Sequence, residues 1–147
     1  MLLASTAAVA AVSEVLVGAV SEVATSLGMT QLFVGVVIVA LVGNAAEHYS
    51  AVVLAARNEM DAAIGIAVGS STQIALFVAP LLVFLSYVIG PAPMDLLFSM
   101  FELVAIGLSV VSIAFIAHDG ETHWMEGVQL LAVYTILCLG FYFLPGA

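Results

Sequence analysis

An amide, a carboxylate and an imidazole interrupt a long apolar stretch of the sequence at Gly43-Asn44-Ala45-Ala46-Glu47-His48. An ionisable group is costly at membrane depth, so it belongs by default to a functional site that faces the protein interior or water. Asn44 and Glu47 are three residues apart and share a helix face. With backbone carbonyls exposed by a bend at Gly43, they form a hard-oxygen set suited to Ca²⁺ or a similar cation. We therefore predict a cation site here, the alternative being a simple kink with Glu47 reaching toward the membrane surface.

A second polar stretch, Gly69-Ser70-Ser71-Thr72-Gln73, lies in the next apolar segment. Ser70 and Gln73 are again three residues apart, and Ser71 lies beside them, so these side chains could complete the shell of oxygen ligands. Glycines and hydroxyl residues in both segments also favour broken helices at the midplane. That construction is usual for ion sites in secondary transporters.

Three further side chains have a predicted role around this site. His48 is a poor calcium ligand but titrates near neutral pH, so it is either a proton-sensitive neighbour of Glu47 or a neutral histidine of the core. Glu14 and Glu22 lie in the first apolar segment, about two helical turns apart. They either line a route by which the ion enters or sit near lipid headgroups at a helix end.

The composition requires a membrane. Of 147 residues, 65% are hydrophobic and only 7% are charged, too few to cover a soluble surface of this size. Ten acids against one base, Arg57, give a net charge of −9, which excludes nucleic acid as a partner and suits cations. The single cysteine, Cys138, excludes an intrachain disulfide. The first residues lack the basic region of a signal peptide, so we expect them to form a retained helix.

Five apolar segments predict an all-α membrane protein of five transmembrane helices in one repeat spanning residues 1–147. Each is near or above the roughly 20 residues that a spanning helix needs. The alternation of a transmembrane barrel strand is absent from them. The second and third are longer than a plain span and are predicted to be kinked or broken at the midplane. The predicted helices cover residues 3–27, 30–57, 61–89, 94–117 and 124–144.

Other chemistries have weak support. His118 and His123 flank a turn but lack the cysteine pairs of a zinc site, so a solvated loop is the preferred interpretation. Ser70 and His48 suggest an intramembrane hydrolase only distantly, because nothing orients a nucleophile there. Zincin, phosphate-loop and nucleophile-elbow motifs are absent from the sequence. We therefore predict a transporter rather than an enzyme, with no cofactor.

The two polar stretches, read with Ile74-Ala75-Leu76-Phe77 after the second, resemble the second repeat of the calcium/proton exchanger family in the cation/calcium exchanger superfamily. The resemblance spans nearly the whole chain. It implies two inverted five-helix repeats and exchange of cytosolic Ca²⁺ for H⁺. It also implies that Glu47 binds both ions, that Asn44 and Gln73 help coordinate, that Ser70 and Ser71 line the site and that His48 belongs to the coupling environment. Exchange of Mn²⁺, or of Na⁺ for Ca²⁺, is the alternative selectivity.

This sequence departs from the family because it holds one repeat where the family has two. Either it is half of a longer exchanger or a subunit that needs a different chain, or it pairs with itself. With Arg57 as its only base, the chain carries almost no positive-inside signal and could insert in both orientations. We therefore expect an antiparallel homodimer of dual topology, in which two opposed copies rebuild the inverted repeat. The expected location is a prokaryotic inner membrane.

Overall fold

A computed structural model describes residues 2–90, 92–118 and 120–144 of the chain. Within these residues all regular secondary structure is helical, and two of the elements are π-helical. The contacts divide the helices into two compact units, one formed by the chain up to Gly43 together with the chain from Trp124 onward, the other by residues 44–123. The elements are α1 (Leu2–Ser26), α2 (Gln31–Phe33), η1 (Val34–Val39), α3 (Ala40–Gly43), α4 (Ala45–Ala56), α5 (Met60–Gln73), η2 (Ile74–Val78), α6 (Ala79–Ile89), α7 (Met100–Ile116) and α8 (Trp124–Phe143).

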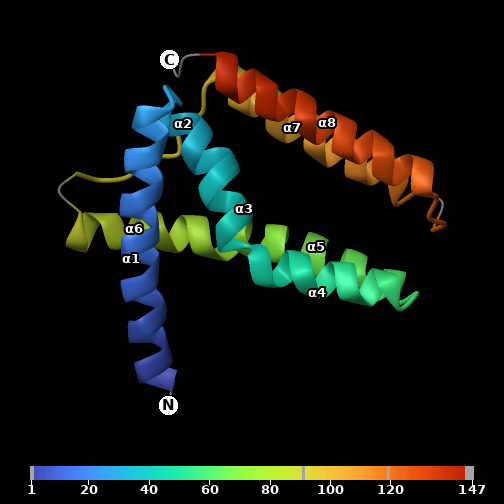
Figure 1. The fold of residues 1–147 in the computed structure, drawn as a ribbon, viewed down its shortest axis with the longest axis horizontal. Coiled ribbons are helices and arrows are strands. Elements are labelled where there is room, and N and C mark those ends of the chain that lie inside the picture. Colours follow the sequence, from blue (N-terminus) through green and yellow to red (C-terminus); the bar gives the residue numbers. More distant parts are fainter. Residues whose placement is uncertain (1, 91, 119, 145–147) are drawn as a thin grey trace. The chain divides into compact units, whose positions relative to one another are not determined.

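The first unit consists of α1, the α2–η1–α3 helix and α8 (Figure 1). Helix α1 ends at Ser26 and is followed by Gly28, whose φ of +69° is a left-handed conformation that glycine adopts without strain. Thr30 then caps α2 by accepting a hydrogen bond from the Phe33 N–H at 3.1 Å. Phe33 and Tyr142 pack edge to face with ring centroids 5.3 Å apart, which joins α2 to α8.

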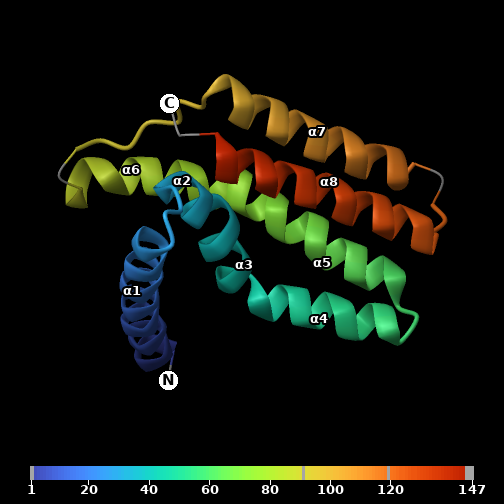
Figure 2. The ribbon, with the colours of Figure 1, turned by 45° about the horizontal axis from the view of Figure 1, so that its top comes forward.

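The second unit contains an antiparallel hairpin of α4 and α5, which lie side by side in both views (Figure 2). The turn between them places Asn58 in the left-handed region at φ +63°. The Glu59 N–H donates to the Leu54 carbonyl at 2.9 Å, and the Asn58 N–H donates to the Ala55 carbonyl at 3.0 Å. These two bonds satisfy carbonyls that the end of α4 would otherwise leave open. Ala63 is buried on α5, and its small side chain allows the two helices to pack closely.

The second helical segment agrees with the prediction, whereas the third and fourth differ from it. The second segment is broken at Asn44, as predicted, whereas the third runs as one helix from Met60 to Ile89 and carries the π-helical stretch η2 in place of a gap. The fourth helix begins at Met100 rather than near residue 94. A capping box sets this start, because the Ser99 hydroxyl and the Glu102 carboxylate each accept a backbone N–H of the other residue.

Several helices are suited to a lipid environment. Judged by length and apolar composition, two described helices can cross a membrane, Met60–Ile89 and Trp124–Phe143. The kinked pair Gln31–Gly43 and Ala45–Ala56 would make a third if it forms one span, and α7 is a shorter apolar helix. Because this count covers the described residues only, the predicted number of five spans stays a prediction.

Candidate cation site

The predicted break in the second segment lies at Asn44. Helix α3 ends at Gly43 and α4 begins at Ala45, while Asn44 between them has φ −100° and ψ 17°. The Asn44 carbonyl accepts the His48 N–H at 3.0 Å, so this residue opens α4 through its backbone. Its side chain makes no capping hydrogen bond. The amide is therefore not committed to capping α4 and is placed where the helix starts.

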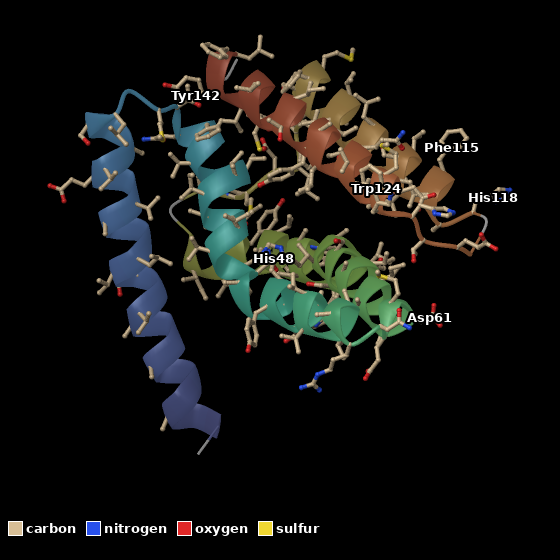
Figure 3. The ribbon with its side chains drawn as sticks, turned by 45° about the vertical axis from the view of Figure 1, so that its right-hand side comes forward. His48, Asp61, Phe115, His118, Trp124 and Tyr142 are labelled. Carbon is tan, nitrogen blue, oxygen red and sulfur yellow. The ribbon has the colours of Figure 1, made fainter. Side chains whose placement is uncertain are left out.

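Glu47 lies in the first turn of α4. The N-terminal end of a helix carries a partial positive charge, because its first N–H groups have no partner within the helix. A carboxylate in the first turn is stabilised by this charge. His48, the next residue of α4, is labelled in Figure 3. The break at Asn44 thus places the carboxyl group of Glu47 in the first turn of a new helix.

A cavity of about 200 Å³ lies between α4 and α5 and brings together most of the predicted site residues. Its polar lining combines the start of α4 with the last full turn of α5, through Asn44, Glu47, His48, Ser70 and Ser71. Among the described residues that line it, Glu47 is the only carboxylate. One carboxylate, one amide and two hydroxyls present five side-chain oxygens, the kind of ligand that Ca²⁺ prefers.

Two predicted ligands are placed differently. Gln73 lies on α5 but is not among the residues that line the cavity. Its position follows from the helical period, because Ser70 and Ile74 share one face and Gln73 falls about 100° from Ile74. Gly43 belongs to the other compact unit, on the far side of the break at Asn44. The roles proposed for both stay predictions.

The apolar part of the cavity wall was not predicted from the sequence. It consists of Ala51 on α4 and of Ile66, Ala67 and Ile74 on the α5 side. The sequence did carry a signal for them, since each lies three or four residues from a polar lining residue and so shares its helix face. Small alanines at two of these positions leave the space that the cavity occupies.

The Ser71 hydroxyl is oriented by its own helix. Its Oγ donates to the Ala67 carbonyl at 2.9 Å. A serine that donates its proton in this way keeps its oxygen lone pairs as acceptors. Thr72 makes the same kind of bond to the Val68 carbonyl at 2.8 Å, although it does not line the cavity. The hydroxyl proton of Ser71 is therefore used by the backbone, and the lone pairs of its Oγ remain available to bind a cation.

We expect Ser71→Ala to weaken Ca²⁺ binding about three- to tenfold, because it removes one neutral oxygen from the wall of the cavity. Ser50→Ala is the matched control: the Ser50 hydroxyl donates to the Ala46 carbonyl at 2.8 Å on α4, but Ser50 does not line the cavity. Isothermal titration with Ca²⁺ measures both variants. An equal loss of affinity in the two would assign the effect to helix stability and contradict a ligand role for Ser71.

The remaining candidate residues lie elsewhere. Glu14 and Glu22 are exposed on α1, in the other unit, and their role in ion access stays a prediction. Glu102 belongs to the capping box of α7. Within the described residues no three His, Cys, Asp or Glu side chains cluster to hold a metal, and Asp119, between His118 and His123, lies outside them.

Comparison with known proteins decides the family. The model of the family described as sodium/calcium exchanger protein matches residues 1–143. The chain belongs to this family. The predicted resemblance to the exchangers is therefore confirmed. With apolar helices and relatives that are membrane transporters, the exchanger chain is an integral membrane protein.

Individual relatives place the chain within the exchangers. It is 48% identical over 145 residues to a Ca²⁺/H⁺ antiporter of Aphanothece halophytica, covering 99% of this chain and 39% of the relative. It is 49% identical over 144 residues to the Ca²⁺/H⁺ antiporter ChaA of Bacillus subtilis, covering 98% of this chain and 41% of ChaA. It is 44% identical to a vacuolar calcium ion transporter of Schizosaccharomyces pombe, covering 99% of this chain and 35% of that protein.

A solved structure shows the same fold. The structure described as native YfkE matches with a TM-score of 0.87 and 49% identity, covering 97% of this chain and 44% of that chain. The exchanger chain thus spans about two fifths of the length of the relatives that it matches. The predicted all-α fold class, with one kinked helix pair, is confirmed.

Proposed function

We propose that this chain acts as one half of a calcium/proton antiporter, with Glu47 as the group that binds Ca²⁺ and H⁺ in turn. The observation that supports this most is the cavity between α4 and α5, which gathers a carboxylate, an amide and two hydroxyls at a helix break. Three similar relatives are a vacuolar calcium ion transporter and two Ca²⁺/H⁺ antiporters. A secondary transporter, rather than an enzyme, suits a site built only of ligands.

The exchange follows from competition for one carboxylate. Ionised Glu47 binds Ca²⁺ together with Asn44, Ser70 and Ser71. Protonation removes the charge of Glu47 and releases the cation, so the two ions occupy the site alternately. His48 lines the same cavity beside Glu47, and we assign it to the proton-coupling environment of that carboxylate. Alternating access to this site then couples an inward flow of one ion to an outward flow of the other.

A second carboxylate has to come from outside the cavity described here, because one Glu47 offsets only half of the charge on Ca²⁺. We propose that a second copy supplies its own Glu47 from the inverted orientation, as an antiparallel homodimer in a prokaryotic inner membrane. The support is the charge pattern: Arg57 is the only base in the sequence, so nothing favours one orientation over the other. The second candidate is a complementary half that carries its own acid, in a longer or a two-chain exchanger.

Reconstitution separates these candidates. Proteoliposomes that contain only this chain should accumulate Ca²⁺ when their interior is acid, because outward proton flow drives the exchange. A cysteine placed at Asn58, in the α4–α5 turn, in a Cys138→Ser background should react with an impermeant thiol reagent from both sides of the membrane. Uptake only after adding a second, different half, with labelling from one side, would exclude the homodimer. No uptake under either condition would exclude the antiporter.

A further inference from the structure

The stretch η2 begins inside the candidate site. Ile74 is both the first residue of η2 and a lining residue of the cavity, and Ser70 and Ser71 lie one turn before it. π-Helical turns are rare inside α-helices and frequent at functional sites. Because η2 lies between α5 and α6 in one continuous helix, a change in its hydrogen-bond register would also change which side chains face the cavity.

Pro80 bears on whether η2 can change its register. The Ala79 N–H donates to the Ile74 carbonyl, five residues back, which is the π-helical pattern. The next donor would be Pro80, which has no N–H, so the π register lacks its bond to Ala75 and an α register would lack its bond to Leu76. Either register therefore loses one hydrogen bond at Pro80. Conversion exchanges hydrogen bonds instead of losing them, which keeps the two registers close in free energy.

Packing determines which half of the helix turns. Helix α5 packs along α4 with Ala63 buried. Among the described residues, helix α6 does not pack along another helix in the way that α5 packs along α4. A change of register in η2 therefore leaves α5 on α4 and rotates η2 and α6 about the helix axis.

The rotation moves one aromatic side chain toward the cavity. An α-helix turns by about 100° per residue. At this angle, four residues of α5 that line the cavity lie within an arc of roughly 80° on either side of Ile74: Ile66, Ala67, Ser70 and Ser71. At roughly 80° per residue in the π register, Phe77 lies about 115° from Ile74 and outside that arc. Phe77 is indeed 61% exposed and does not line the cavity. In the α register it would lie about 60° from Ile74, within the arc and about one turn beyond Ile74, at the α6 end of the cavity.

We propose that η2 is a hinge and that Phe77 is a gate, which closes the α6 end of the cavity when η2 adopts the α register. The proposal rests on the proposed function, because a gate has a role only if the cavity holds a transported cation. Alternating access requires that a bound ion be closed off from one side before it is released to the other. Phe77 is large and apolar, so its arrival beside Ile74 at the α6 end of the cavity would exclude water from that side.

The test uses the full chain in proteoliposomes and compares two exposed phenylalanines of one helix. Phe77→Ala should raise passive Ca²⁺ efflux, measured without a proton gradient, about tenfold by weakening the closed state. Phe84→Ala is the matched control, since Phe84 is 72% exposed on α6 and does not line the cavity, and its efflux should stay at the wild-type level. Equal efflux from the two variants would overturn the gate.

A second measurement does not depend on transport. Cysteines at positions 77 and 84, each in a Cys138→Ser background, are reacted with a soluble thiol reagent with and without saturating Ca²⁺. We expect Ca²⁺ to slow labelling at position 77 about tenfold and to leave position 84 unchanged. An unchanged rate at position 77 would overturn the hinge. Absence of Ca²⁺ flux in the wild-type chain would instead overturn the proposed function, with the labelling result still deciding the conformational change.

Discussion

Glu47→Gln should abolish Ca²⁺ uptake driven by an acid interior, to below about 1% of the wild-type rate. The substitution keeps the size and one oxygen of the side chain but removes the charge that offsets Ca²⁺ and the group that exchanges it for a proton. Glu47 is the only carboxylate among the described residues that line the cavity. No neighbouring acid can therefore replace it within this half. Uptake of radioactive Ca²⁺ into proteoliposomes measures the effect.

Glu59→Gln is the control for charge. Glu59 is an exposed acid just before α5, does not line the cavity and makes no capping bond through its side chain. It should transport at a rate close to wild type, since a solvated surface acid contributes little. Wild-type uptake by Glu47→Gln, or a comparable loss in both variants, would contradict the assignment of Glu47 as the exchanging group.

The local chemistry of the site could be predicted because helical spacing is a local rule. The three-residue separation of Asn44 and Glu47 predicted a shared face, and both side chains line one cavity. Membrane character and the break at Asn44 also followed from the sequence, since an amide beside a glycine interrupts an apolar helix. The pairing of α4 with α5 depends on the tight turn at Asn58, whose left-handed conformation a non-glycine residue adopts only infrequently.

Two details differ from what apolar runs and helical spacing alone indicate. The start of the fourth helix at Met100 is set by reciprocal hydrogen bonds of Ser99 and Glu102, and the signal in the sequence is the Ser-x-x-Glu pattern of a capping box. Gln73 was predicted beside Ser70 from their three-residue spacing and from the family resemblance, and its ligand role stays a prediction. The cavity instead favours the face of Ile74, because the position of α4 determines which side of α5 it meets. The helical period shows which residues of α5 share a face, but the packing of α4 determines which of these faces lines the cavity.

Ala67→Leu should reduce Ca²⁺ uptake more than tenfold by filling the cavity while leaving every polar ligand in place. Ala67 lines the cavity, and its carbonyl accepts the Ser71 hydroxyl at 2.9 Å, so a larger side chain here lies directly beside the ligand oxygens. Overpacking of this kind costs about 1–3 kcal/mol when neighbours must shift. Because the cavity holds about 200 Å³ of space, the added atoms should enter it rather than unfold the helix pair.

Ala62→Leu separates obstruction of the site from a general effect of volume, since Ala62 is exposed on α5 and does not line the cavity. Both variants should elute from a sizing column and melt like the wild type, and only Ala67→Leu should lose Ca²⁺ binding and flux. If Ala67→Leu binds Ca²⁺ normally, the cation does not occupy the space between α4 and α5. Glu47 would then hold Ca²⁺ elsewhere, with ligands other than Ser70 and Ser71. Glu47→Gln thus tests which charge binds Ca²⁺, and Ala67→Leu tests whether the ion occupies the cavity between α4 and α5.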